Sequence, residues 1–350
     1  RQRLALDLMV DQGYVTREEA DKAEGEKIVF RARQEKIFAP HFVFYVKEQL
    51  TSNYGEKIVE QGGLRVFTTL DYDFQKAAEK AVEEGVNKNK KFEATNASLV
   101  AVDPKNGEIL AMVGAKDYFD TEHDGNVNVS TSLRQPGSSF KPIVYAAAFI
   151  KGYTPDTVLY DVVTTFKTEI KDYEPHNYDD REHGPVTMRQ ALAGSLNIAA
   201  VKTIYLTGID RVLNLAEDMG YTSLGDRSRF GLSLVLGGAE VRLLEHVMAF
   251  SAFANDGVKN ETPLSILKVQ DKEGRVLEEV TYKPKRVLSK EIARTMDSVL
   301  SDNNARSYIF GVKNYLTLKD RPAAAKTGTT NDYRDAWAIG FTPQLVTGVW

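Results

Sequence analysis

The chain has 350 residues, in which 45 Lys and Arg stand against 49 Asp and Glu, for a formal net charge of −4. This balance argues against a nucleic-acid partner or binding to an anionic membrane surface. The absence of cysteine excludes disulfides, thiolate metal sites and a catalytic thiol. The length suggests about two domains, at roughly 150 residues each.

Both ends of the chain predict a piece of a longer protein. It begins at Arg1 without a signal-like segment and stops at Trp350, inside an apolar stretch typical of a strand. No uncharged apolar run reaches the roughly 18 residues of a membrane-spanning helix. We therefore expect any membrane anchor to lie outside this sequence.

Residues 1–25 have the pattern of two short helices. The apolar periodicity stops at Gly13, and Thr16 followed by Glu19 three residues later forms a capping-box start. The pattern looks like the end of an upstream region.

Residues 26–96 predict a small mixed α/β region. An apolar helix follows Pro40, and "GLRVFTT" alternates as a strand does. Asp71 is a predicted cap for the helix "YDFQKAAEKAVEEGV". The apolar positions of that helix predict one buried face, made by Phe74, Ala77, Ala78, Ala81 and Val82.

From Ala97 onwards the pattern is that of an α+β domain. "ASLVAVDPKNGEILAMVGA" predicts an antiparallel hairpin, helices dominate 138–256, and a second hairpin turns at 272–274. Ser289 caps a further helix, and the last 28 residues predict two or three strands. We expect one antiparallel sheet whose first and last strands lie together, with a helical subdomain.

The stretch "RQPGSSFKP" contains two adjacent serines and a lysine. Residues i and i+3 share a helix face, so Ser138 can meet Lys141, whereas Ser139 cannot easily do so. Pro142 fits only in a first helical turn, which places the Ser138 hydroxyl at a helix N-terminus. Taken alone, this S-x-x-K is more typical of a capping serine ahead of a solvated lysine.

Two further motifs follow along the chain. Ser195 and Asn197 place a hydroxyl and an amide between two apolar helical stretches. "KTGTT" offers the Lys326 cation and the hydroxyls of Thr327 and Thr329 on a strand, with Gly328 allowing close backbone approach. Such a strip suits an anionic carboxylate. S-x-x-K, S-x-N and K-T-G in this order are the signature of penicillin-binding proteins and class A β-lactamases.

The chain resembles a class A, bifunctional penicillin-binding protein over essentially its whole length. The resemblance divides it into the tail of a glycosyltransferase domain (1–25), a linker domain (26–96) and a transpeptidase domain (97–350) that is incomplete at its C-terminus. It implies a penicillin-binding, β-lactamase-like fold. Since the body of the glycosyltransferase domain is absent, we expect no glycan polymerisation by this piece.

The resemblance implies D,D-transpeptidation of peptidoglycan stem peptides, with β-lactams as inhibitors that acylate the nucleophile. Ser138 is the expected nucleophile and Lys141 its general base, which requires burial and a nearby cation, Lys326, to lower its pKa. Ser195 is expected to relay a proton and Asn197 to bind the donor amide and orient Lys141. Lys326, Thr327, Gly328 and Thr329 are the expected carboxylate-binding strip, and the backbone N–H groups of Ser138 and Thr329 the expected oxyanion hole.

No cofactor or metal is expected. The implied partners are a D-Ala-D-Ala donor peptide, an amine acceptor and the cell-wall synthesis machinery. The implied location is the extracytoplasmic side of a bacterial cell membrane, where an N-terminal helix outside this chain anchors the full-length protein.

Several alternatives stay open at this point. A serine β-lactamase is suggested by "DRVLN" at 210–214, although Asp210 is more easily interpreted as a helix N-cap. A D,D-carboxypeptidase and a β-lactam-sensing or peptide-binding module use the same residues. A metal site could use His176, Asp179, Asp180 and His183, but loops of this composition are usually solvated.

Overall fold

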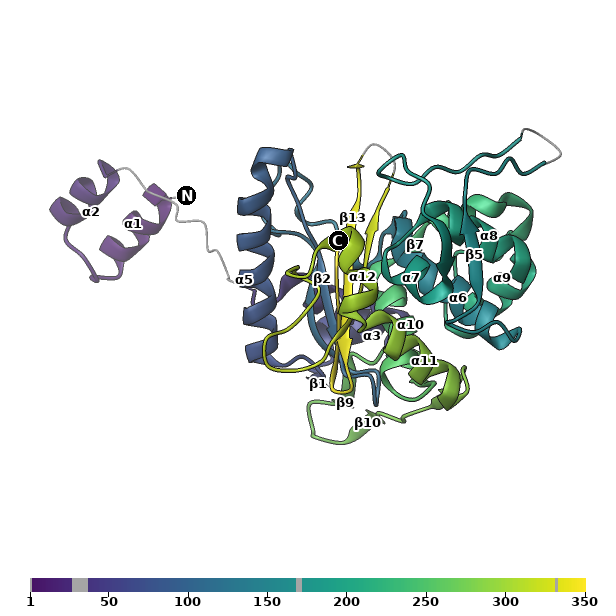
Figure 1. The fold of residues 1–350 in the computed structure, drawn as a ribbon. Helices are drawn as coiled ribbons and strands as arrows, with labels where there is room; N and C mark the ends of the chain where they lie inside the picture. The colour runs from purple at the N-terminus through teal and green to yellow at the C-terminus, as the bar shows by residue number, and fades with distance from the viewer. Residues whose placement is uncertain (1, 27–36, 168–171, 331–332) are drawn as a thin grey trace. The chain divides into compact units, whose positions relative to one another are not determined.

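The computed structural model describes residues 2–26, 37–167, 172–330 and 333–350 (Figure 1). The chain divides into two compact units, Arg1–Phe38 and Ala39–Trp350, which are described separately.

The first unit is a pair of short helices, α1 (Gln2–Asp11) and α2 (Arg17–Glu24). Gly13 between them has φ +74°, a left-handed conformation that glycine adopts without strain. The Thr16 side chain accepts from the Glu19 N–H, and the Glu19 carboxylate accepts from the Thr16 N–H, which completes the predicted capping box. The two predicted helices are confirmed.

The second unit contains the remaining elements. Its α-helices are α3 (Pro40–Tyr54), α4 (Glu56–Gln61), α5 (Tyr72–Asn89), α6 (Lys141–Ile150), α7 (Met188–Ala193), α8 (Asn197–Thr207), α9 (Ile209–Asp218), α10 (Leu243–Ala254), α11 (Lys290–Leu300) and α12 (Asn303–Phe310). Short 3₁₀ turns are η1 (Lys90–Phe92), η2 (Val129–Thr131), η3 (Gly137–Phe140), η4 (Arg227–Arg229) and η5 (Leu232–Leu236).

The strands form one larger sheet and several small ones. They are β1 (Arg65–Thr68), β2 (Leu99–Val102), β3 (Ile109–Val113), β4 (Leu133–Arg134), β5 (Val158–Asp161), β6 (Gly184–Thr187), β7 (Val241–Arg242), β8 (Val258–Asn260), β9 (Ile266–Gln270), β10 (Val276–Glu279), β11 (Pro284–Arg286), β12 (Ala324–Thr329), β13 (Ala336–Thr342) and β14 (Leu345–Val349).

The main sheet has five antiparallel strands in the order β12-β13-β14-β2-β3. Strand β14 pairs with β2, with Val346 opposite Val102, so the last strands of the chain close onto the first hairpin (yellow beside blue in Figure 1). The predicted antiparallel sheet with adjacent first and last strands is therefore confirmed. Among the strands that the structure describes, β12 pairs only with β13, so it forms one edge of the sheet.

Helices cover both faces of this sheet. Helix α5 packs on β2 and β3, and α10 packs on the opposite face against β2, β13 and β14 (Figure 1). Asp71 caps α5 as predicted, accepting from the N–H groups of Asp73 and Phe74. The predicted buried face of α5 is partly wrong: Phe74, Ala77 and Ala81 are exposed, whereas Gln75, Ala78, Val82 and Val86 are buried.

The buried face of α5 differs from the predicted face because the polar side chain of Gln75 is buried. The Gln75 side chain is buried and bonds the backbone of Met112 in both directions, Met112 N–H to Oε1 at 2.9 Å and Nε2 to the Met112 carbonyl at 3.3 Å. A buried carboxamide satisfied in this way costs little. The apolar pattern alone therefore placed the buried face too far to one side.

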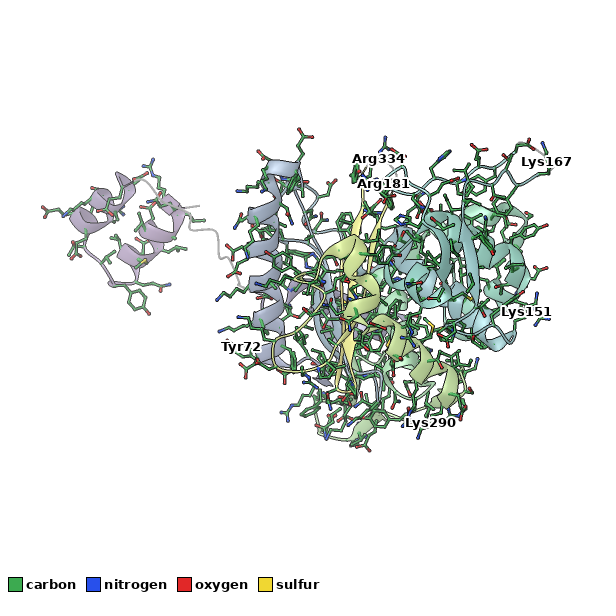
Figure 2. The ribbon with its side chains drawn as sticks, in the orientation of Figure 1. Tyr72, Lys151, Lys167, Arg181, Lys290 and Arg334 are labelled. Atoms are coloured by element: carbon green, nitrogen blue, oxygen red, sulfur yellow. The ribbon has the colours of Figure 1, made fainter. Side chains whose placement is uncertain are left out.

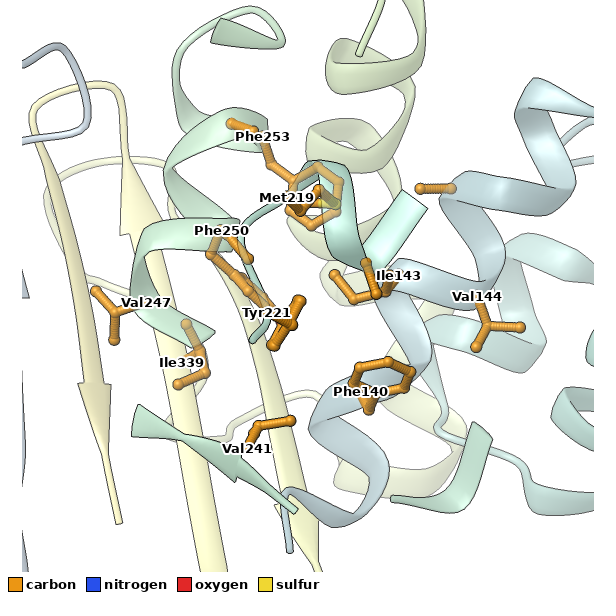
Figure 3. Close-up of a cluster of buried hydrophobic side chains, with 14 of the residues drawn as sticks. Phe140, Ile143, Val144, Met219, Tyr221, Val241, Val247, Phe250, Phe253 and Ile339 are labelled. Carbon is orange, nitrogen blue, oxygen red and sulfur yellow. The ribbon is translucent and has the colours of Figure 1, made fainter. Parts of the chain in front are cut away.

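The helical subdomain shares its core with the α10 face of the sheet. Phe140, directly after the serine pair, packs edge-to-face on Tyr221 with ring centroids 5.7 Å apart (Figure 3). Phe250 and Ile339 belong to the same cluster and are fully buried. Burial of each such side chain contributes about 1.5–3 kcal/mol, so the segment that follows Ser138 is anchored firmly in the core.

The small sheets connect distant parts of the second unit. Strand β1 pairs with β9, and β9 with β10, which confirms the second predicted hairpin. Strand β1 lies in the predicted linker region, so this region shares a sheet with residues 266–279. Residues 27–36 of that region lie outside the described residues.

Figure 2 shows the side chains of the described residues, and its labelled basic residues lie on the outside of the second unit. Lys290, for example, pairs with Asp256 at 3.2 Å. Among the described residues, no helix has the length and apolar character needed to cross a membrane.

Candidate active site

Ser138 lies in the 3₁₀ turn η3, immediately before helix α6. Helix α6 begins at Lys141, which adopts right-handed helical dihedrals (φ −49°, ψ −41°) although Pro142 follows it. The first turn of a helix tolerates proline because the missing N–H has no intrahelical partner there. In a 3₁₀ turn residues i and i+3 eclipse, so Ser138 and Lys141 share a face.

The Lys141 ammonium is fully buried and bonds one short segment, residues 195–197. Its Nζ donates to the Ser195 carbonyl at 2.6 Å, to the Leu196 carbonyl at 3.1 Å and to Asn197 Oδ1 at 2.8 Å. The Ser195 hydroxyl oxygen is 3.4 Å away. Lys141 therefore lies between the turn that carries Ser138 and the start of α8.

Ser195 lies at the break between α7 and α8 with φ +62°, a conformation that non-glycine residues rarely adopt. Strain of this kind costs about 1–3 kcal/mol and persists where surrounding contacts demand it. Lys326 Nζ supplies one such contact, donating to Ser195 Oγ at 2.8 Å and to the Thr327 carbonyl at 2.8 Å. The second and third motifs thus meet at the Ser195 hydroxyl.

Burial controls the charge of both lysines. The pKa of Lys141 is held well below its ordinary range, first by burial and then by the positive charge of Lys326, while Asp161 acts in the opposite direction. Burial, followed by the charge of Arg306, lowers the pKa of Lys326 to about 7. Burial and the charge of Lys326 both favour the neutral amine form of Lys141, the form that a general base requires.

Two glycines allow strand β12 to approach the serine turn, the 3₁₀ turn η3 that carries Ser138 and Ser139. A Cβ on Gly328 would collide with the Pro136 carbonyl oxygen, and a Cβ on Gly137 would overlap the backbone of Thr329. Gly137 also has φ +54°. The half-buried Thr327 and Thr329 therefore line one pocket with Ser138 and Ser195, which is completed by residues of the 177–179 loop, the 194–196 break and the end of α12.

Comparison with known proteins places this geometry in a family. Residues 97–348 match the penicillin binding protein transpeptidase domain. The chain belongs to the penicillin-binding protein transpeptidase family. Over its whole length it is 30% identical to penicillin-binding protein 1A of Aquifex aeolicus and 33% identical to penicillin-binding protein 2D of Bacillus subtilis. It covers 58% and 51% of these relatives, so the chain spans about half the length of the curated relatives it matches.

Solved structures of the family share the fold. The crystal structure of penicillin-binding protein 1A from Haemophilus influenzae matches 99% of this chain and 70% of that chain with a TM-score of 0.79 and 25% identity. The PonA1 protein of Mycobacterium tuberculosis, solved in complex with penicillin V, matches 90% of this chain and 84% of that chain with a TM-score of 0.75 and 24% identity. The predicted fold class and the resemblance to class A penicillin-binding proteins are confirmed.

Ser139, the residue after Ser138, faces away from the pocket. It is fully buried, its hydroxyl donates to the Pro136 carbonyl at 2.6 Å, and its oxygen lies 2.9 Å from His246 Nε2. Because the Ser139 proton is engaged, Nε2–H of His246 donates, and Nδ1 accepts from the Tyr221 hydroxyl at 2.6 Å. These buried hydrogen bonds, which run from Tyr221 through His246 and Ser139 to Pro136, hold the serine turn in place.

Sequence reasoning missed Tyr178, which lies against strand β12. Its hydroxyl donates to the Thr329 carbonyl at 2.9 Å. Its pKa is raised by burial and by Tyr333, and a hydrogen bond with the Ser138 side chain opposes that shift. Tyr178 belongs to the polar loop "YEPHNYDD", in which the sequence pattern drew attention only to the histidines and acids.

That loop does not gather a metal-ligand set. His183 pairs with Asp179 at 3.1 Å, and His176 lies 3.5 Å from Glu174. Within the described ranges no three His, Asp or Glu side chains come together in a way that could hold a metal ion.

The β-lactamase-like stretch at 210–214 lies away from the pocket. Helix α9 begins at Ile209 with Gly208 as its N-cap, so the predicted capping role of Asp210 is wrong. Gly208 takes the cap because its φ of +95° turns the chain directly out of α8. Asp210 lies in the first helical turn with its side chain exposed, 3.8 Å from Arg227.

Proposed function

We propose that this chain is a serine D,D-transpeptidase that cross-links peptidoglycan stem peptides. The observation that carries the proposal is the buried Lys141, which shares a face with Ser138 and bonds Asn197 and the Ser195 backbone, with Lys326 on the Ser195 hydroxyl. Membership of the transpeptidase family supports a serine acyltransferase. The donor and acceptor identities belong to the proposal.

In the first half-reaction, neutral Lys141 takes the Ser138 hydroxyl proton as the oxygen attacks the carbonyl of the penultimate D-Ala. The peptide bond breaks, the proton held by Lys141 passes through the Ser195 hydroxyl to the leaving amine, and free D-Ala departs. The product is a Ser138 ester of the donor peptide. An acceptor amine then attacks that ester, forming the cross-link and returning the proton to Ser138.

The remaining residues bind and orient the donor. Asn197 is proposed to hold the donor amide through the second hydrogen of its Nδ2, while Oδ1 accepts from Lys141. Thr327 and Thr329, with the charge of Lys326, suit the terminal carboxylate. The N–H groups of Ser138 and Thr329 are the proposed oxyanion hole, in which each donor contributes about 3–4 kcal/mol. Gly328 acts by permitting close approach of β12.

The domain division and location are part of the same proposal. Residues 1–25 are taken as the tail of a glycosyltransferase domain, 26–96 as a linker domain and 97–350 as the transpeptidase domain. The full-length protein is proposed to be membrane-anchored with this part on the extracytoplasmic side, alongside the cell-wall synthesis machinery.

Mass spectrometry after benzylpenicillin treatment tests the nucleophile. We expect a covalent adduct on the peptide that contains Ser138, no adduct in Ser138→Ala, and an adduct in Ser139→Ala. An adduct that survives in Ser138→Ala would overturn the assignment.

A product assay then separates the activities. The protein is incubated with a D-Ala-D-Ala peptide and an amine acceptor, and we expect cross-linked product together with free D-Ala. Free D-Ala without cross-linked product indicates a carboxypeptidase, rapid release of hydrolysed penicillin indicates a β-lactamase, and a stable adduct without either product indicates a sensing module.

A further inference from the structure

Asp161, at the end of β5, is a fully buried carboxylate behind the active site. Its Oδ1 accepts from the Ala199 N–H at 3.0 Å, and its Oδ2 accepts from Asn177 Nδ2 at 2.6 Å and from the His183 N–H at 3.2 Å. All three partners are hydrogen-bond donors, so the site is built for an acceptor group. The proposed mechanism gives this residue no part.

Asn177 continues the contact from Asp161 to helix α8. It is buried, and its Oδ1 accepts from the N–H of Asn197 at 2.7 Å and from the N–H of Ile198 at 3.3 Å. Its Nδ2 donates to Asp161 and to the Arg181 carbonyl, at 2.8 Å for the latter. The first three N–H groups of α8, which have no partner within the helix, are thus bonded by two side chains from outside it.

The loop that carries Asn177 also sets the orientation of the Asn197 carboxamide. Asn197 Nδ2 donates to the His176 carbonyl at 2.9 Å, which leaves Oδ1 pointing at Lys141 Nζ, 2.8 Å away. A rotated amide would place two donors together at Lys141. The path from Asp161 through Asn177 to Asn197 and Lys141 is therefore an unbroken series of hydrogen bonds.

We propose that Asp161 and Asn177 are positioning residues of the transpeptidase site, which hold the start of α8 so that Asn197 orients Lys141. The inference rests on the proposed function. It adds two residues that act through the helix they cap, the fully buried Asp161 and Asn177, which also lines the pocket.

Asp161 also places a negative charge near two lysines, Lys141 and Lys202. It raises the pKa of Lys141, against the lowering by burial and by Lys326, and it raises the pKa of the partly exposed Lys202 on α8. The same charge helps to raise the pKa of the Tyr145 hydroxyl on α6 and of the Tyr308 hydroxyl on α12. Removing it therefore lowers the pKa of Lys141 further.

Asp161→Asn and Asn177→Ala give different signatures in the pH dependence of benzylpenicillin acylation. We expect Asp161→Asn to slow acylation about ten- to a hundredfold, by analogy with the loss of residues that orient ligands in metal sites. We also expect the rising limb, the pH range over which the acylation rate increases, to move to lower pH. Asn177→Ala leaves the Asp161 charge in place, so it is expected to slow acylation without moving the limb. Asp210→Asn, an exposed acid on α9, is the matched control and is expected to change neither.

Exchange of the two residues provides a rescue. In Asp161→Asn alone, the new amide faces the Asn177 amide and the His183 N–H, so donors meet donors. The double variant Asp161→Asn/Asn177→Asp restores the buried charge and the donor–acceptor pair between the two side chains. It also sets the new carboxylate against the Arg181 carbonyl and leaves the His183 N–H without an acceptor side chain, so it is expected to recover only part of the lost rate. Circular dichroism melts of each variant report folding separately.

The inference is overturned if folded Asp161→Asn keeps the wild-type rate and pH limb, or if the exchange is no better than the single variant. It is also overturned if neither single variant folds, because the pair is then structural only. Failure of the wild type itself to form the Ser138 adduct would count against the proposed function instead, and is seen before any variant is compared.

Discussion

At the residue scale, the two serines of "RQPGSSFKP" have separate environments. Ser138 lies in the pocket with Ser195 and Thr329, whereas Ser139 bonds Pro136 and His246 in the core. Helical spacing to Lys141 predicted different surroundings for the two serines. The partner of Ser139 could not be predicted, because His246 lies 107 residues further along the chain.

The charge on Lys326 is predicted to set the pH at which Lys141 becomes neutral. Lys326 lowers the pKa of Lys141, so its removal in Lys326→Met raises that pKa and keeps Lys141 protonated to higher pH. The rising limb of the acylation rate should therefore move to higher pH in a stopped-flow benzylpenicillin assay. The pKa of Lys326 itself is about 7, so its influence is greatest below that pH.

Lys326→Arg is the matched control, since it keeps a cation at this position. Its limb should lie at lower pH than that of Lys326→Met, even if the bulkier guanidinium slows the reaction. Coincident limbs in the two variants would contradict the electrostatic coupling.

At the element scale, the contact between β12 and η3 brings the K-T-G strand to the turn that carries Ser138. Gly328 lies against Pro136, and Gly137 lies against Thr329, so the edge strand reaches the serine turn only because both positions lack a Cβ. The approach brings the Thr329 backbone beside the turn that carries Ser138. The K-T-G motif predicted this need for a small residue, whereas the role of Gly137 became visible only in the structure.

Gly328→Ala is predicted to separate this strand from the turn. The added methyl overlaps the Pro136 carbonyl, and overpacking of this kind costs about 1–3 kcal/mol of stability. Because a displacement of about 1 Å at a reacting centre can cost a hundredfold in rate, acylation should fall by about that factor. Rates are measured with benzylpenicillin and stability by urea titration.

The control is Gly340→Ala on the neighbouring strand β13. A Cβ there meets only the Ala324 carbonyl oxygen, at 3.7 Å, which is ordinary contact. It should leave acylation near the wild-type rate. Equal losses of acylation rate in the two variants would show that any alanine in this part of the sheet is harmful. They would contradict the prediction that close approach of β12 to the serine turn requires Gly328.

At the scale of the whole molecule, the buried His246 links folding to pH. Burial lowers its pKa to about 3, against the effect of its hydrogen bond with Ser139. In the unfolded chain histidine titrates near pH 6.5. Below that pH the unfolded state binds the proton more readily, so stability is lost as the pH falls from about 6.5 towards 3, by about 5 kcal/mol over the full range.

His246→Gln is predicted to flatten this acid loss. Its amide can donate to Ser139 and accept from Tyr221 without titrating, so the melting temperature should fall less steeply between pH 6.5 and 4, from a lower starting value at pH 7. Thermal melts across this range measure the slope. His176→Gln, at a histidine whose side chain is 57% exposed, should keep the wild-type slope, and a wild-type slope in His246→Gln as well would contradict the prediction.

Most helices and hairpins could be predicted because their signals are local. The Thr16–Glu19 capping box and the Ser289 cap appear where the sequence placed them. The buried face of α5 was misjudged because Gln75 is buried through a backbone contact with Met112 in another element. Periodicity reports polarity along one helix and carries no information about such a partner.

By itself, the sequence determined the residue types and local geometry of the site: a serine and a lysine three positions apart, an S-x-N break and a K-T-G strand. Only the tertiary structure decided that Asp161 and Asn177 cap α8, that Tyr178 bonds Thr329, and that the Lys326 ammonium reaches Ser195. These contacts join residues far apart in the chain. They depend on how helices and strands pack around one buried core, which short-range patterns do not encode.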